Sequence, residues 1–252
     1  MNSGLACSNA SVRFGAFTAL DAISVDFAPN LLHGVIGPNG AGKTTLINAL
    51  SGLQTLTTGR VLLNGRDITA LPAHRRAHLG IGRSFQITKT FPTMTVFENL
   101  RLAGQASRFD VQPFWRSVTA YRRLAAAAEE MLDFIGLRKL RDVIVGQLAH
   151  GDQRALEVGL TLMGNPSIVL LDEPLAGVGQ QEVDRAVDLM RRMREGRTVI
   201  LIEHNMKVMM ALADRIVVMA RGALLATGTP DEVRADARVR AIYLGEDEDA
   251  GA

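Results

Sequence analysis

Cysteine is almost absent from this 252-residue sequence, since Cys7 is the single one. One cysteine excludes an internal disulfide and a zinc site made of four cysteines, and it fits a reducing compartment such as the cytosol. No apolar run approaches the roughly 18 residues that a membrane-spanning helix needs. Residues 1–10 also lack the charged start and apolar core of a signal peptide. We therefore expect a soluble chain that reaches a membrane only through partner proteins.

An excess of charge of one sign is also lacking, because 28 Lys and Arg against 26 Asp and Glu leave a formal net charge of +2. So small an excess is not the basic surface that binding to duplex nucleic acid requires, and we expect no nucleic acid partner. Apolar residues make up 47% of the chain and charged residues 21%, which excludes a disordered or collagen-like protein. The length fits one large domain, or a core with a smaller insert.

Short apolar runs alternate along the chain with longer stretches of helical periodicity, which is typical of a mixed sheet flanked by helices. Strands are expected at residues 12–14, 23–27, 32–36, 59–63, 168–171, 198–202 and 215–219. Several of these runs are continuous Val, Ile and Leu, which indicates strands buried on both faces. The sequence therefore predicts an α/β fold.

Residues that favour the start or the end of a helix mark several of the expected helices. Residues 181–195 carry acidic side chains early and arginines late, which complements the helix dipole, and Gly196 follows as a stop. Thr229, Pro230 and Glu232 form a capping-box start for a helix to about residue 241, and residues 246–249 read as a solvated acidic tail. Residues 88–150 hold no convincing strand but an alanine-rich helix near 124–135 that Gly136 ends, so we expect a helical insert there.

The strongest motif lies at residues 37–44, which match the pattern G-x-x-x-x-G-K-S/T between an apolar strand and a helix-like segment. Its glycines allow the backbone to curl, so that several N–H groups point at the β- and γ-phosphates of a nucleotide. Lys43 supplies a mobile cation, and Thr44 offers a hydroxyl to Mg²⁺. A plain glycine-rich turn is the alternative, and the flanking strand and helix argue against it. The predicted nucleotide contacts are Gly37, Pro38, Asn39, Gly40, Ala41, Gly42, Lys43, Thr44 and Thr45.

Two carboxylates follow the apolar strand at 168–171, at the strand end where doubly wound sheets bind ligands. Asp172 is expected to hold a water on Mg²⁺, and Glu173 to orient or deprotonate the attacking water. A strand that ends in acidic residues is also a common turn signal. Together with the phosphate loop, however, this pair predicts the second half of a nucleoside triphosphate site.

Three further segments carry a resemblance: Arg83-Ser84-Phe85-Gln86, Leu148-Ala149-His150-Gly151-Asp152-Gln153-Arg154, and Glu203-His204. Their order and spacing resemble those of the ATP-binding subunits of ABC transporters, from about residue 12 to residue 245. The resemblance implies a P-loop NTPase core with a mixed sheet flanked by helices, an antiparallel β portion near the N-terminus and an inserted helical subdomain. It also implies a single ATPase domain with its core at residues 1–87 and 151–225, the helical subdomain at 88–150, and a C-terminal helix and tail at 226–252.

The resemblance assigns roles residue by residue. Gln86 becomes the glutamine that reaches Mg²⁺ and the attacking water, and His204 becomes the histidine that contacts the γ-phosphate; with Glu173 and Lys43 they form the expected catalytic set. Phe14 resembles the aromatic residue that stacks on adenine, with Phe17 as the competing candidate. The predicted metal ligands are Thr44, Gln86 and Asp172.

Residues 148–153 resemble the signature motif, which faces the nucleotide of a second ATPase subunit. The resemblance therefore implies a head-to-tail dimer of copies or paralogues, in which Ala149, Gly151 and Asp152 contact the partner's ATP. This segment departs from the common pattern, since Ala149 replaces a serine and Asp152 a glutamine, and Gly179 stands where an aspartate is usual.

Several segments together are similar to those of branched-chain amino acid importers: residues 83–86, 94–100, 151–154 and 241–246. This implies permease subunits in the cell membrane, an extracytoplasmic substrate-binding protein, and a place at the cytoplasmic face. Phe91, Met94 and Phe97 either contact the permease or pack the insert. Urea or short-amide import, lipopolysaccharide export and a soluble ABC-type ATPase acting on nucleic acid stay open as alternatives. A GTPase is disfavoured, because no Asn-Lys-x-Asp segment is present.

Overall fold

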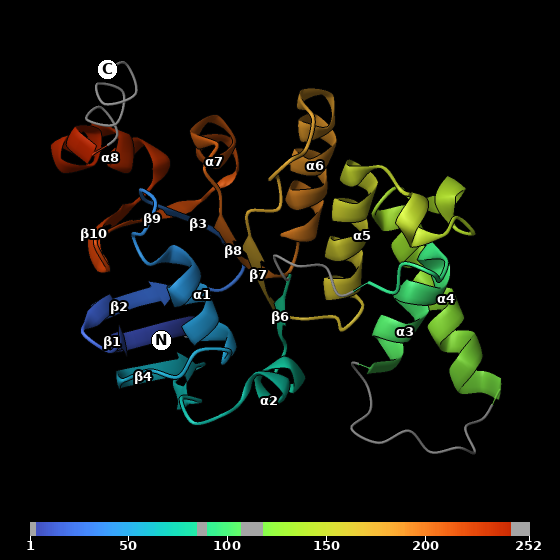
Figure 1. Cartoon of the computed structure of the whole chain (residues 1–252), viewed down its shortest axis with the longest axis horizontal. Helices are drawn as coiled ribbons and strands as arrows, with labels where there is room; N and C mark the ends of the chain where they lie inside the picture. Colours follow the sequence, from blue (N-terminus) through green and yellow to red (C-terminus); the bar gives the residue numbers. More distant parts are fainter. Residues whose placement is uncertain (1–3, 85–89, 107–117, 243–252) are drawn as a thin grey trace.

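The computed structural model describes residues 4–84, 90–106 and 118–242, arranged around two sheets (Figure 1). The smaller sheet is antiparallel, with the order β2-β1-β4-β5. Its strands are β1 (Leu5–Phe14), β2 (Phe17–Phe27), β4 (Thr58–Leu63) and β5 (Arg66–Asp67). This is the antiparallel portion near the N-terminus that the resemblance implied.

The larger sheet has six strands in the order β10-β9-β3-β8-β7-β6, and all but β10 are parallel to their neighbours. They are β3 (Leu32–Ile36), β6 (Ile81–Arg83), β7 (Ile168–Asp172), β8 (Thr198–Ile202), β9 (Arg215–Ala220) and β10 (Ala223–Gly228). Every residue of β3, β7 and β8 is buried, because both faces of the sheet are covered. These three strands are adjacent, so the segments that follow their carboxyl ends lie side by side.

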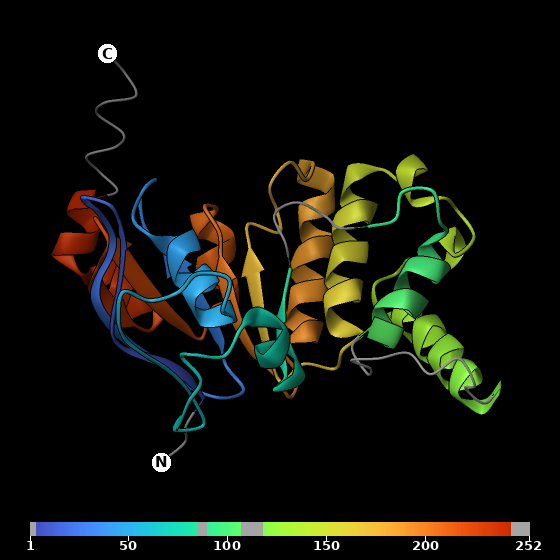
Figure 2. The ribbon, with the colours of Figure 1, turned by 60° about the horizontal axis from the view of Figure 1, so that its bottom comes forward.

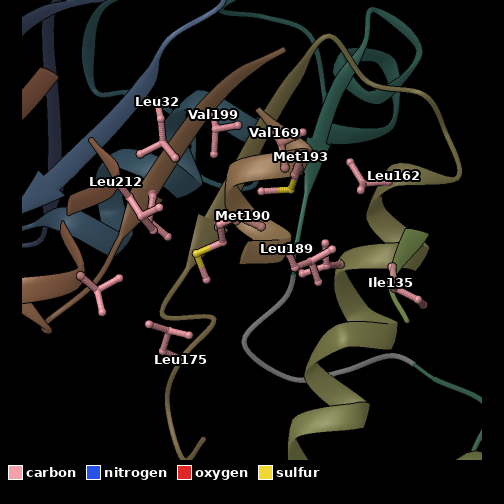
Figure 3. Close-up of a cluster of buried hydrophobic side chains, with 14 of the residues drawn as sticks. Leu32, Ile135, Leu162, Val169, Leu175, Leu189, Met190, Met193, Val199 and Leu212 are labelled. Carbon is pink, nitrogen blue, oxygen red and sulfur yellow. The ribbon is translucent and has the colours of Figure 1, made fainter. Parts of the chain in front are cut away.

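Helix α1 (Lys43–Ser51) fills the space between the two sheets, where Leu46, Ile47 and Leu50 are fully buried. The opposite face of the large sheet packs against α6 (Gln180–Met193) and α7 (Met206–Leu212). Met190 and Met193 of α6 lie over this face (Figure 3). The fold thus has layers of small sheet with α1, large sheet, and helices.

Three further helices extend the molecule away from the small sheet (Figures 1 and 2). They are α3 (Val96–Ala106), α4 (Val118–Phe134) and α5 (His150–Leu162), with 3₁₀ turns at Arg138–Leu140 and Val145–Gln147. Helix α5 lies beside α6 and also packs against α3 and α4, so it joins the helical end to the sheet (Figure 2). A short helix, α2 (Ala73–His78), precedes β6. The boundaries expected for the helical subdomain stay a prediction.

The α/β fold with its mixed sheet is confirmed, and a strand lies at each of the seven expected positions. The strands expected at 12–14 and 23–27 are longer than predicted, since β1 begins at Leu5 and β2 at Phe17. Three strands were not predicted: β5 and β6 have only two and three residues, and β10 is poor in β-branched residues. A tight turn at Arg221 and Gly222, which both have positive φ (50° and 77°), folds β10 back against β9.

The helix expected from Pro230 to about residue 241 is wrong in its extent. Helix α8 (Pro230–Ala235) stops at Asp236, whose backbone is extended. The Asp236 carboxylate accepts a hydrogen bond from the backbone N of Arg238 (2.8 Å), which caps a new helical stretch at 237–242. The capping box at Thr229 and Glu232 is present as predicted. The acidic segment 246–249 lies outside the described residues. No helix in the described ranges is both long and apolar enough to cross a membrane.

Candidate active site

The loop between β3 and α1 has a backbone that only glycine accommodates at two of its positions. Gly42 has φ 96°, and a Cβ there would lie 2.5 Å from the carbonyl oxygen of Ala19 on β2. A Cβ at Gly37 would lie 2.1 Å from the carbonyl oxygen of Met219 on β9. The Ala41 carbonyl accepts a hydrogen bond from the N of Gly222 (3.1 Å). Neighbouring strands therefore press against the loop and hold it curled at the start of α1.

Lys43 is the first residue of α1 and is buried. Its Nζ donates hydrogen bonds to the carbonyl oxygens of Gly37 (2.6 Å) and Pro38 (3.0 Å). The ammonium group thus lies within the loop, where it supplies positive charge beside the backbone amides of the first helical turn. Thr44 and Thr45 are half-buried in the same turn. This arrangement suits a polyphosphate anion.

Asp172, the last residue of β7, holds a carboxylate that is almost fully buried. Burial raises its pKa, as does Glu173 to a lesser extent, while Arg83 (Nη2 3.8 Å from Oδ2), the Thr44 hydroxyl and Lys43 lower it. Among the described residues neither carboxylate oxygen has a hydrogen-bond partner of good geometry. Two unused buried oxygens near a threonine hydroxyl form a donor set that a hard divalent cation fits.

Glu173 follows Asp172 with φ 51°, a left-handed backbone conformation that is uncommon outside glycine. Its backbone N donates to the carbonyl oxygen of Ile202 on the neighbouring strand β8 (3.0 Å). Its Oε1 lies 2.7 Å from Nε2 of His204, two residues beyond β8. Both side chains reach solvent. The turn thus directs a carboxylate and an imidazole toward each other at the carboxyl edge of the sheet.

Glu203 and Arg83 are two buried charged side chains beside these groups for which the sequence indicated no role. Glu203 accepts a hydrogen bond from the backbone N of Leu175 (2.7 Å), and burial raises its pKa. Arg83 donates to the hydroxyl of Ser51 (2.9 Å), and burial lowers its pKa. The sequence feature that could have indicated both residues is a charged residue directly at the end of an apolar strand.

The predicted signature residues lie at the start of α5. Asp152 accepts a hydrogen bond from Arg185 of α6 (3.0 Å), and a Cβ at Gly151 would touch the carboxylate of Glu182. Nε2 of His150 lies 3.3 Å from the carbonyl oxygen of Ala176. This segment therefore contacts α6 and the loop after Glu173. Ala149 is the exposed N-cap of α5.

The two candidate adenine platforms face each other across the β1–β2 turn. Phe14 and Phe17 are paired in register and are 51% and 62% exposed, which is unusual for large apolar side chains. Gln86 lies outside the described residues. The structure therefore brings together Lys43, Thr44, Asp172, Glu173 and His204 at adjacent strand ends, with the aromatic pair on the hairpin that leads into β2.

A curled glycine loop before a helix, with an acidic strand end two strands away, defines a nucleoside triphosphatase of the P-loop class. A model of the ABC transporter family matches residues 20–176, and a model described as branched-chain amino acid ATP-binding cassette transporter matches residues 223–249. The chain belongs to the ABC transporter family, as an ATP-binding cassette that hydrolyses ATP.

Similar proteins match over nearly their whole length. The high-affinity branched-chain amino acid transport ATP-binding protein BraF of Pseudomonas aeruginosa is 38% identical, over 96% of this chain and 98% of its own. LivG of Escherichia coli K12, which carries the same description, is 36% identical over 93% and 95%. The lipopolysaccharide export system ATP-binding protein LptB of Haemophilus influenzae is 32% identical over 96% and 97%.

Solved structures agree with the fold. The ADP conformation of MJ1267, an ATP-binding cassette of an ABC transporter, has a TM-score of 0.85 and 31% identity, with coverage of 97% of this chain and 100% of that one. A nucleotide-free cassette from an ABC transporter has a TM-score of 0.83 and 31% identity, with coverage of 95% and 98%. The predicted P-loop NTPase fold is thus confirmed.

Proposed function

We propose that this chain powers the import of branched-chain or other hydrophobic amino acids. The observation that carries the proposal is the match of residues 223–249 to the branched-chain amino acid transporter model, since this segment lies outside the general cassette match. The identity to BraF (38%) compared with that to LptB (32%) supports it. Lipopolysaccharide export is the second candidate, and urea or short-amide import a third.

In the proposed reaction the amides of residues 37–44 and Lys43 bind the β- and γ-phosphates of ATP. Glu173 accepts a proton from a water, which attacks the γ-phosphorus as the bond to the β–γ bridging oxygen breaks, and ADP and phosphate leave. His204, which is 2.7 Å from the Glu173 carboxylate, steadies that carboxylate and faces the γ-phosphate. Phe14 stacks on adenine.

Mg²⁺ belongs to this proposal. Thr44, Asp172 and Gln86 would hold it, and the buried oxygens of Asp172, which lack a hydrogen-bond partner among the described residues, support that assignment. When bound, the ion would neutralise charge on the phosphates. No group of three or more His, Cys, Asp or Glu that could hold a metal occurs in the described part of the chain, which suits an ion bound partly by phosphate oxygens.

A second ATPase subunit completes the proposed site. Ala149, Gly151 and Asp152 at the start of α5 would contact the nucleotide of that subunit, and the partner would do the same in return. The bond from Arg185 to Asp152 orients the carboxylate along α6, so we propose that the backbone of Gly151 provides the main contact.

Permease subunits are the proposed membrane partners, which would place the chain at the cytoplasmic face with an extracytoplasmic substrate-binding protein on the other side. A groove of about 800 Å³ lies between α2, β6 and the end of α5, and Leu53, Leu79 and Pro166 are among its lining residues. Phe91, which precedes α3, is 55% exposed. Phe97, in contrast, is packed against the core and lies under Arg141 (4.1 Å), so it supports the alternative that it packs the insert. We propose that the groove receives a cytoplasmic segment of the permease and that Phe91 makes a separate contact with it.

The ATPase roles are tested with Glu173→Gln and Lys43→Ala. Glu173→Gln should retain ATP, form a stable dimer and lose at least about 100-fold in turnover, because only proton acceptance is removed. Lys43→Ala should lose measurable nucleotide binding. Undiminished turnover in the first variant, or undiminished affinity in the second, would contradict the assigned roles.

The cargo is tested by purifying the chain from membranes with its permease and binding protein, and by reconstituting the complex in liposomes. We expect leucine, isoleucine or valine with the binding protein to stimulate ATP hydrolysis. Stimulation by urea or a short amide, or co-purification with a lipopolysaccharide export complex, would refute amino acid import.

A further inference from the structure

Glu203 is a buried carboxylate that the proposed reaction leaves without a task. It follows β8 directly and is 5% exposed, so a structural reason must offset the cost of removing its charge from water. Oε1 accepts a hydrogen bond from the backbone N of Leu175, three residues beyond Asp172, at 2.7 Å. The bond therefore joins the segment after β7 to the segment after β8.

Two further hydrogen bonds join the same two segments. The backbone N of Glu173 donates to the carbonyl oxygen of Ile202 (3.0 Å), and Nε2 of His204 lies 2.7 Å from Oε1 of Glu173. With the Glu203–Leu175 bond they close a ring that contains the whole turn at residues 173–175. This ring is built from side chains and backbone at the carboxyl ends of adjacent strands.

The turn inside this ring needs support from its surroundings. Glu173 holds φ 51°, a conformation that a non-glycine residue keeps only when its neighbours over-determine it. The bond to Ile202 fixes the turn before the Glu173 side chain, and the bond to Glu203 fixes it after Pro174. Without the bond between the Leu175 amide and Glu203, the Glu173 backbone would relax and its carboxylate would turn away from His204.

We propose that Glu203 is a positioning residue that clamps the turn at residues 173–175 onto the end of β8 and so aims the Glu173 carboxylate. The clamp also sets the loop that continues to Ala176, whose carbonyl oxygen contacts His150 at the start of α5 (3.3 Å). This inference rests on the proposed roles of Glu173 and His204.

The test compares Glu203→Met, which keeps the volume but accepts no hydrogen bond from an amide, with Glu203→Gln, which retains an acceptor. In Glu203→Met we expect kcat to fall about 10- to 100-fold while KM for ATP changes less than about threefold, because the phosphate loop is untouched. Hydrogen exchange at the Leu175 amide should accelerate at least about tenfold. Glu203→Gln should restore both values to within about threefold of wild type.

Asp214→Leu is the matched control. Oδ2 of Asp214 also accepts a hydrogen bond from a backbone N, that of Leu32 (2.8 Å), but at the start of β3, which is the opposite end of the parallel strands. In Asp214→Leu, kcat should stay within about twofold of wild type even when this variant loses as much stability as Glu203→Met. If Glu203→Met does not fold, Glu203→Asp serves in its place: it keeps the charge, falls one methylene short of the Leu175 amide, and should show the same loss of kcat.

The outcomes separate the two levels of the proposal. Fast exchange at Leu175 with an unchanged kcat in Glu203→Met would overturn the clamp while wild-type hydrolysis stands. Equal changes in kcat and KM, matched by the Asp214→Leu control, would also overturn it, because they report a general loss of structure. Undiminished turnover in Glu173→Gln would refute the proposed role of Glu173 itself, and the clamp with it.

Discussion

Arg76 holds the carboxyl end of α1, the helix that starts at the phosphate loop. The side chain is 2% exposed, and its guanidinium donates to the carbonyl oxygens of Ala49 (2.7 Å) and Leu50 (2.8 Å) in the last turn of α1. It also donates to those of Thr69 and Leu71 (both 2.9 Å). The last carbonyls of a helix have no i+4 amide within the helix to pair with. Arg76 therefore supplies a donor to Leu50, and it adds a shorter bond to Ala49, whose carbonyl also accepts from the backbone N of Gly52 at 3.3 Å.

Replacing this arginine by methionine keeps most of the apolar contact and removes all four donors. The buried Leu50 carbonyl that loses its partner costs about 1.5 kcal/mol, and the Ala49 carbonyl, which keeps the bond from Gly52, about 1 kcal/mol. Each of the two part-buried carbonyls costs about 0.5 kcal/mol, because water can replace the donor. Relief of the buried charge, whose burial lowers the pKa of Arg76, offsets about 1 kcal/mol. We expect the free energy of unfolding to fall by about 2.5 kcal/mol in Arg76→Met.

Urea unfolding followed by far-UV circular dichroism measures this loss, and Tm should fall by about 5–10 °C. Arg75→Met is the control, because Arg75 is the exposed neighbour on the same helix and should change stability by less than about 0.5 kcal/mol. Arg76→Lys should recover less than half of the loss, since an ammonium cannot reach four carbonyls in a plane. If Arg76→Met unfolds at the same urea concentration as wild type, the four hydrogen bonds of Arg76 do not contribute to stability and the reasoning is wrong.

Three further predictions concern the loop, the aromatic pair and the thiol. Gly42→Ala should weaken ATP binding at least about tenfold, because φ 96° and the contact with β2 forbid a Cβ. Gly65→Ala, with φ 78° in a remote turn, should leave ATP binding unchanged. Equal affinities of the two variants in a fluorescent-nucleotide titration would contradict this. Phe14→Ala should weaken ATP binding about 3- to 10-fold and Phe17→Ala less, and the reverse order would assign stacking to Phe17. Burial raises the pKa of Cys7 to about 11, so only about one thiol in a thousand is ionised at pH 8 and labelling should require unfolding; rapid labelling of folded protein by iodoacetamide would show that the thiol is accessible.

Much of the candidate site could be predicted because its chemistry is local. Three glycines and a lysine within eight residues specify a curled loop whatever surrounds it, and the strand at 168–172 ends in carboxylates in the sequence as in the structure. The capping box at Thr229 was also readable, since it needs only residues three apart.

Other features depend on neighbours that no local pattern reveals. The strand β6 exists because Ile81, Gly82 and Arg83 find a partner in β7, and the extended backbone of Asp236 breaks a helix that the periodicity alone would continue. The hydrogen bond from the Leu175 amide to Glu203 spans 28 positions of the chain, and that from Arg76 to the Ala49 carbonyl spans 27.

The sequence by itself determined the elements, the phosphate loop and the kinds of groups that surround it. Only the tertiary structure decided that β8 lies between β3 and β7, which brings Lys43, Glu173 and His204 to one edge of the sheet. The physical reason is that a strand's neighbours are chosen by the burial of both sheet faces and by pairing between distant segments, whereas a turn or a cap is chosen by the residues that form it.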